Sequence, residues 1–255
     1  MKNVKKHFEE EAEEFDKTIL KLIPMYDEML DSMISVIPFE SGDKFKLLDL
    51  GSGTGNITKK VKDKFSNSMI TCIDIAENMI EMAKIKLKAY NDIKYYTGDF
   101  LEVNFEDKFD VVLSSLALHH IKTDEDKKKF YRRIYGLLKP GGVFLNSDYV
   151  LGSNGNLNRI YRRKWIDFML LNLPEIEVKE KWIPKEMEED FPAPLINHLK
   201  WLDETGYKSV DVVLKYYGHA VYCGTRPKSW FLIKNMIFYI TKDIIKLRIL
   251  YTRIE

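Results

Sequence analysis

The chain has little cysteine, almost no net charge and no long apolar run. Its 255 residues include two cysteines, Cys72 and Cys223, which both lie in apolar, strand-like stretches. Two isolated thiols form neither a disulfide framework nor a zinc cluster, so we expect buried thiols and a cytoplasmic protein. The formal charge of +1 gives no overall attraction to nucleic acid or to a membrane. We also expect neither a membrane-spanning segment nor a signal peptide, because no stretch has the required length or apolar core.

Three glycines separate an apolar run from a helical pattern at residues 47–56, LLDLGSGTGN. The run predicts a buried parallel strand with Asp49 near its end. Glycine tolerates positive φ and lets a ligand approach the bare backbone, so Gly51, Gly53 and Gly55 indicate a bound molecule at the turn. The spacing fits neither the G-x-G-x-x-G turn of dinucleotide-binding folds nor the Gly-Lys-Ser/Thr of a phosphate-binding loop.

The pattern acid-x-G-x-G-x-G resembles the first motif of the class I S-adenosylmethionine (SAM) methyltransferases. Four later segments resemble the family's further motifs in the same order and at its usual spacings. They are MITCID at residues 69–74, YYTGDF at residues 95–100, FDVVLS at residues 109–114 and LLKPGGVFL at residues 137–145. The resemblance covers residues 5–226 and is strongest over residues 46–150 and 195–225.

This resemblance implies SAM as the cofactor and a set of residues that bind it. Asp49 would help to hold the amino group of the methionine part, Asp74 would accept from the ribose hydroxyls, and Asp99 would accept from the adenine amine. The other implied contacts are the turn residues Gly51, Ser52 and Gly53, the apolar walls Ile75, Met79 and Phe100, Ser114, and Tyr26, whose hydroxyl would reach the methionine end.

We expect an α/β, Rossmann-like methyltransferase sheet of seven strands with helices on both faces. Strands one to six would be parallel and the seventh antiparallel. Two helical patterns precede the first strand, within residues 4–37. The expected parts are N-terminal cover helices at 1–45, a SAM-binding core at 46–150, a helical lid that selects the substrate at 151–195, completion of the sheet at 196–226 and an amphipathic helix at 227–255.

Methyl transfer needs an aligned nucleophile, and it needs a base only when that nucleophile must lose a proton. His119 is the candidate catalytic residue, as a base or substrate ligand, because histidine titrates near neutral pH. A packing role is the alternative for both His119 and His120. Adjacent residues of a helix do not share a face, so we expect at most one of the two to point into the cleft. His198 and Tyr149 are weaker candidates, and no metal site is expected.

The acceptor is expected to be a small molecule. Nucleobase methylation is disfavoured because SSLA stands where an Asn/Asp-Pro-Pro-aromatic motif would be, and neither cysteine follows a proline. One alternative is a carboxy-SAM synthase, but that resemblance requires an arginine where this chain has Trp201, with Lys200 as the cation nearby. The other alternative is a regulatory protein that binds SAM without turning it over.

The tail at residues 227–255 lies beyond the resemblance. Its apolar residues recur three and four apart and predict one stripe of a helix, while lysines and arginines occupy the other sides. The stripe could pack on the protein itself, in a homodimer, or peripherally on an anionic membrane. The stripe residues are Trp230, Ile233, Ile237, Ile240, Ile244, Leu247 and Tyr251.

Overall fold

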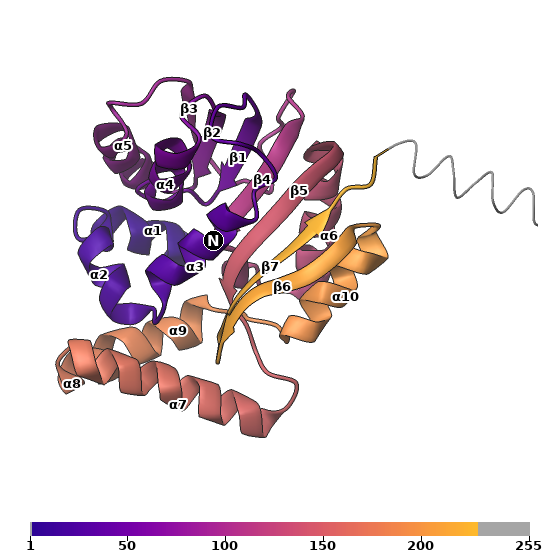
Figure 1. Ribbon diagram of the computed structural model, residues 1–255. Coiled ribbons are helices and arrows are strands. Elements are labelled where there is room, and N and C mark those ends of the chain that lie inside the picture. Colours follow the sequence, from indigo (N-terminus) through magenta and orange to yellow (C-terminus); the bar gives the residue numbers. More distant parts are fainter. Residues whose placement is uncertain (1, 229–255) are drawn as a thin grey trace, which may run out of the picture.

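Short runs of leucine, isoleucine and valine build one seven-stranded sheet in the computed structural model, which describes residues 2–228 (Figure 1). The strand order is β3-β2-β1-β4-β5-β7-β6. Strands β1 to β5 pair in parallel, and β7 is antiparallel to both of its neighbours, as expected. The strands are β1 Lys46–Leu50, β2 Met69–Asp74, β3 Ile93–Thr97, β4 Phe109–Ser115, β5 Leu138–Tyr149, β6 Lys208–Tyr216 and β7 His219–Thr225.

The two faces of the sheet bury separate apolar cores. Successive side chains of a strand point to opposite faces, so Leu47 joins one core and Leu48 the other. The core around Leu47 packs against α3 and α4, and the core around Leu48 packs against α6 and α10. The helices in the central part of the chain are α4 Asn56–Lys64, α5 Glu77–Lys86, the 3₁₀ turn η1 Leu118–His120, α6 Asp124–Leu137 and α10 Leu195–Thr205.

Three helices precede the first strand, where two helical patterns were expected. They are α1 Lys2–Glu11, α2 Phe15–Leu22 and α3 Tyr26–Ser35. The extra break lies at residues 12–14, and the backbone turns again at Met25, which has φ of +61°. The Pro-Gly-Gly segment also differs from expectation. It lies inside β5 rather than before it, and the register between β4 and β5 shifts between Phe109 and Val111.

The insertion after β5 is helical and lies beside the N-terminal helices (Figure 1). Asn154 begins it by accepting from the backbone N–H of Asn156 and Leu157. Helix α7 packs on α2, where the indole N–H of Trp165 donates to the Leu22 carbonyl at 2.9 Å. The elements are α7 Gly155–Asn172, α8 Glu175–Glu177, the π-helical turn η2 Val178–Trp182 and α9 Ile183–Glu189. Within residues 2–228, no helix is long and apolar enough to cross a membrane.

Candidate active site

The turn after β1 brings the backbone against the first loop beyond β4. Gly51 has φ of +69°, and a Cβ atom placed there would lie 2.5 Å from the Cβ of Ala117. Only glycine fits this position, because both the backbone conformation and the space exclude a side chain. Two residues later, the backbone N–H of Gly53 donates to Asp74 Oδ2 at 2.8 Å. This bond fixes the turn to the end of β2.

A hollow of about 740 Å³, which is open to solvent, lies above this turn. It lies at the carboxyl ends of β1, β2 and β4, and helix α1 covers it with Val4 and Phe8. Eight of the residues expected to bind the cofactor line it: Tyr26, Gly51, Ser52, Gly53, Asp74, Ile75, Met79 and Phe100.

The other three expected residues do not line this hollow. Asp49 is fully buried behind the turn and accepts from the Thr58 hydroxyl at 2.6 Å. Asp99 accepts from the backbone N–H of Leu101. The Ser114 hydroxyl donates to the Leu50 carbonyl at 2.8 Å, between β4 and β1. The roles of all three residues stay predictions.

A second cavity of about 860 Å³ adjoins the hollow and shares the side chains of Phe8, Phe15, Leu116 and His120 with it. Its walls come from the N-terminal helices, the insertion and the loop after β4. They are mostly apolar and include two tryptophans. The remaining lining residues include Ile19, Leu22, Ile23, His119, Tyr149, Trp165, Trp182, Glu186, Asp190 and His219.

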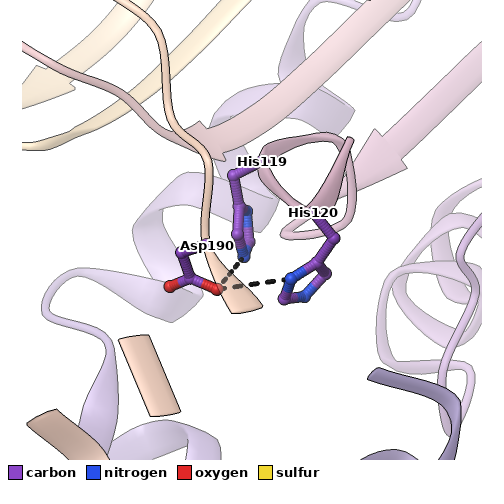
Figure 2. Close-up of side chains that lie close together, drawn as sticks. All are labelled: His119, His120 and Asp190. Carbon is purple, nitrogen blue, oxygen red and sulfur yellow. Dashed lines mark ion pairs between the residues drawn. The ribbon is translucent and has the colours of Figure 1, made fainter. Parts of the chain in front are cut away.

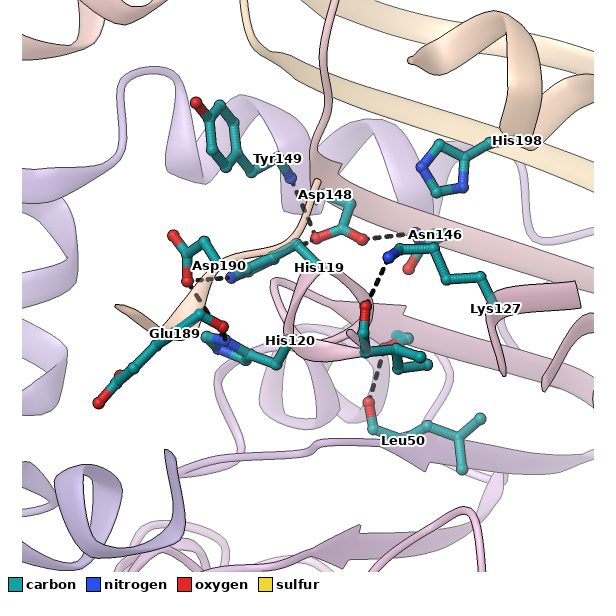
Figure 3. Close-up of polar contacts among 12 residues, drawn as sticks. Leu50, His119, His120, Lys127, Asn146, Asp148, Tyr149, Glu189, Asp190 and His198 are labelled. Carbon is teal, nitrogen blue, oxygen red and sulfur yellow. Dashed lines mark hydrogen bonds and ion pairs between the residues drawn. The ribbon is translucent and has the colours of Figure 1, made fainter. Parts of the chain in front are cut away.

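A buried network of hydrogen-bonded and ion-paired side chains borders this second cavity (Figure 3). His119 Nδ1 lies 2.5 Å from Asp148 Oδ1, and the other Asp148 oxygen accepts from the Asn146 amide at 3.3 Å. The Nε2 atom of His119 lies 3.6 Å from Asp190 Oδ1. Burial lowers the pKa of His119, but Asp190 and Asp148 raise it more, so the pKa lies above its usual value.

Both adjacent histidines line the second cavity, so the expectation of at most one was wrong. They lie in the 3₁₀ turn η1 rather than at the start of an α-helix, and their rings are tilted with centroids 4.1 Å apart. Asp190 Oδ1 lies close to a nitrogen of each ring, 3.6 Å from His119 Nε2 and 3.3 Å from His120 Nδ1 (Figure 2). The tight turn and this common partner draw both rings to one side.

Known proteins share both the sequence pattern and the fold. The model of a methyltransferase domain matches residues 48–146. The chain is 28% identical to the carboxy-S-adenosyl-L-methionine synthase of Nautilia profundicola, over 87% of this chain and 95% of that protein. It is also 28% identical to a malonyl-[acyl-carrier protein] O-methyltransferase of Ilyobacter polytropus, over 58% of this chain and 54% of that protein.

A solved structure agrees with this pattern. Phosphoethanolamine N-methyltransferase 2 of Haemonchus contortus, in complex with SAM, superposes with a TM-score of 0.58 at 19% identity, covering 80% of this chain and 53% of that one. Residues 48–146 therefore carry a methyltransferase domain, and the chain has the fold of the class I SAM-dependent methyltransferases. Its match spans about half the length of the Ilyobacter and Haemonchus proteins.

The hollow of this methyltransferase fits SAM, because buried polar atoms around it lack partners. The hydroxyls of Ser52 and Ser115 and the Oδ1 atom of Asp49 are buried without a hydrogen bond among the described residues. A buried polar atom without a partner is costly, so the two serine hydroxyls, which line the hollow, are suited to bind ligand groups. Tyr26 also lines the hollow, and its hydroxyl accepts from the Asn56 amide at 3.2 Å.

Sequence reasoning missed several residues of the methyltransferase site. Ser115 lines the hollow, whereas its neighbour Ser114 was selected. Phe8 and Phe15 line both cavities, although their shared helix face only indicated a cover helix. Asp190 lies 70 residues beyond His120, and no sequence spacing connects the two.

Proposed function

We propose that this methyltransferase transfers the methyl group of SAM to a small, largely apolar acceptor bound in the second cavity. The observation that carries the proposal is that the two cavities share the walls formed by Phe8, Phe15, Leu116 and His120. Displacement at the sulfonium requires the acceptor in line with the methyl group and away from water. Adjoining cavities under one helical cover meet this need. In the reaction, the bond from sulfur to the methyl carbon breaks as the bond from the acceptor to that carbon forms.

We propose that His119 contacts the reacting group of the acceptor, as a base or as a substrate ligand. Its Nδ1 atom is held by Asp148, so its Nε2 atom faces the second cavity beside Asp190. A histidine fixed in this way presents one defined nitrogen, as in other carboxylate–histidine pairs. The acceptor would therefore carry a hydroxyl or another group that loses a proton on methylation.

The insertion at 151–195 is proposed to be the lid that selects the acceptor. Trp165 of α7 lines the second cavity, whereas Leu171 of the same helix is 83% exposed. We expect Trp165→Ala to raise the KM for the acceptor at least tenfold and to leave SAM affinity within about twofold, because the change removes a large apolar part of the cavity wall. Leu171→Ala is the matched control, and equal effects of both changes would contradict the assignment.

The acceptor can be found with SAM that carries an isotopically labelled methyl group. Incubation with fractionated metabolite pools should transfer the label to a small molecule, which mass spectrometry identifies. His119→Gln should lower kcat at least a hundredfold with SAM binding retained. SAM binding without transfer in every pool would favour the alternative, a regulatory SAM-binding protein.

Carboxy-SAM synthesis is the second candidate, because similarity to the Nautilia enzyme extends over 95% of that protein. The resemblance to carboxy-SAM synthases implies an arginine in the helix before strand six, which would hold the added carboxylate. Here Trp201 is buried against Tyr131 and His198, and the side chain of Lys200 is 71% exposed. Neither residue offers a buried cation, which favours ordinary SAM. A SAM adduct heavier by one carboxyl group after incubation with cell extract would reverse this choice.

The tail at 227–255 falls almost wholly outside the described residues. Its amphipathic pattern supports a peripheral membrane contact or a homodimer, with intramolecular packing as the third possibility. Flotation with anionic liposomes and sizing of the full-length and truncated proteins test these choices. The cytoplasm is the proposed compartment, supported by two free cysteines, Cys72 and Cys223.

A further inference from the structure

We propose that His119, His120 and Asp190 bind a first-row divalent cation whose open coordination positions face the acceptor cavity. Three ligating atoms converge here: His119 Nε2, His120 Nδ1 and Asp190 Oδ1 lie within 4.8 Å of one another (Figure 2). Two histidines and one carboxylate are a donor set suited to zinc, iron, cobalt or nickel.

The distances fit a shared cation better than direct hydrogen bonds. Asp190 Oδ1 lies 3.6 Å from His119 Nε2 and 3.3 Å from His120 Nδ1. Donors at about 2.1 Å from a tetrahedral cation are about 3.4 Å apart. A charge-assisted hydrogen bond would close to about 2.8 Å. The carboxylate oxygen therefore stands at the spacing of a common ligand sphere.

The orientation of His119 gives a second, independent argument. A neutral His119 donates its Nδ1 proton to Asp148, 2.5 Å away, so its Nε2 atom carries a lone pair. That lone pair faces the negative oxygen of Asp190, and the two repel unless a positive charge lies between them, which either a second proton on the imidazole or a bound cation supplies. A carboxylate behind the distal nitrogen is also the usual support of a metal-bound histidine. Asp148 is itself fully buried and held by Asn146 and by the backbone N–H of Tyr149 (Figure 3).

His120 has a metal-free alternative. Its Nδ1 atom lies 3.1 Å from the Glu189 carbonyl oxygen and can donate a proton there. Binding of a cation would displace that proton. Metal binding should therefore weaken as the pH falls.

The location gives the cation a role in methyl transfer, and this part rests on the proposed function. In the metal-bound state the Nε2 atom of His119 is a ligand and does not itself take up the acceptor's proton. His120 lines both cavities, and His119 and Asp190 line the second. Three protein ligands leave positions open, as in catalytic rather than structural metal sites. An acceptor hydroxyl bound there would lose its proton to solvent more readily and would present an oxygen anion to the methyl group.

Metal titration tests the site without any acceptor. The full-length protein, dialysed against EDTA, is titrated with Co²⁺, whose visible absorption reports its coordination, and with Zn²⁺ by calorimetry. We expect one equivalent to bind, and His119→Gln, His120→Gln and Asp190→Asn each to weaken binding at least tenfold. His7→Gln is the matched control, because His7 lines the same cavity from α1. SAM binding and circular dichroism show which variants are folded.

Several results would overturn the proposal: no stoichiometric binding, equal affinity in all folded variants, or loss of binding only in His7→Gln. The titration is independent of SAM, so its failure would leave the proposed methyl transfer standing. Failure of SAM binding would defeat the proposed function and leave the metal site. Once an acceptor is known, full transfer in EDTA would remove the catalytic role of the cation, whereas restoration by Zn²⁺ or Co²⁺ would support it.

Discussion

Gly51 is the residue on which the shape of the cofactor hollow depends most directly. Its φ of +69° disfavours any side chain, and its Cα faces Ala117 so closely that a methyl group would collide. We expect Gly51→Ala to weaken SAM binding at least tenfold by displacing the turn, with some loss of stability from the strained backbone. Calorimetry with SAM measures the effect. Gly42→Ala is the control, because nothing lies within 4 Å of a Cβ atom there. Unchanged SAM affinity in a folded Gly51→Ala protein would contradict this account of the turn.

Asp49 should couple SAM binding to pH. Burial raises its pKa to about 7, the Thr58 hydroxyl opposes this rise, and the charge of Asp74 adds to it. In the free protein at pH 5.5, Asp49 is therefore mostly protonated. If its unpaired Oδ1 atom serves the ammonium group of SAM, binding requires the ionised carboxylate and expels a proton.

The affinity for SAM should then rise about tenfold between pH 5.5 and 7, where the ammonium group stays charged. Calorimetry in buffers of different ionisation enthalpy should show the released proton. Asp49→Asn should bind SAM more weakly and lose this pH dependence. A wild-type affinity that is constant from pH 5.5 to 7 would remove Asp49 from the ammonium site.

At the scale of elements, helix α1 covers the cofactor hollow and is held in place by ion pairs. Glu11 contacts His7 Nε2 at 2.9 Å, Lys185 Nζ at 2.7 Å and Lys181 Nζ at 2.8 Å, which fastens α1 to the insertion. Burial would raise the pKa of Glu11, but these cations hold it well below its usual value. The stabilisation is therefore present above the unfolded pKa of about 4.5 and is lost only in strong acid.

We expect Glu11→Gln to speed SAM dissociation about fivefold, because α1 covers the hollow with Val4 and Phe8. Stopped-flow fluorescence measures the rate. Glu10→Gln is the matched control, since the Glu10 side chain is 65% exposed and pairs with Lys6 alone among the described residues. Equal dissociation rates in both variants would show that α1 does not limit the release of SAM.

The sequence predicted local elements well and distant contacts poorly. The strand Met69–Asp74 was predicted to the residue, because a continuous apolar run ending in an acid is a local signal. Asn154 caps the start of α7 and Gly206 caps the end of α10, as the sequence predicted. Other contacts depend on tertiary packing, which no local pattern contains. They are the ion pair of Glu11 in α1 with Lys185 in α9 and the approach of Asp190 to two histidines. Eight of the expected cofactor residues line one hollow, and six of them lie at or just after the end of a strand, where the motifs place them; Tyr26 and Met79 lie in helices. The second cavity is built by segments without a motif.

At the scale of the whole molecule, a buried chain of polar groups crosses the core between the sheet and two helices. The Asn146 amide donates to the Tyr222 hydroxyl at 2.7 Å, which lies 2.9 Å from the Tyr131 hydroxyl. Tyr131 in turn lies 2.7 Å from His198 Nδ1. His198 is thus occupied in the core and lies outside both cavities, unlike Tyr149. The chain joins β5, β7, α6 and α10, so its integrity affects the fold rather than the site.

This series of buried hydrogen bonds requires a neutral His198, and the requirement makes the stability of the protein depend on pH. Burial lowers the pKa of His198 to about 4, with Lys127 adding to this effect and Asp148 opposing it. In the unfolded chain the pKa is about 6.5, so as the pH falls below 6.5 the unfolded state takes up a proton that the folded state refuses. The destabilisation caused by His198 is therefore absent above pH 6.5 and grows as the pH falls to 4.

At pH 5 this destabilisation should lower the free energy of unfolding by about 2 kcal/mol. Urea denaturation at pH 7 and 5 measures it, and His198→Gln should reduce the difference by that amount. His219, whose pKa burial also lowers to about 4, keeps its share in the variant. The same pH difference in both proteins would show that His198 is protonated in the fold and that the buried chain tolerates the charge.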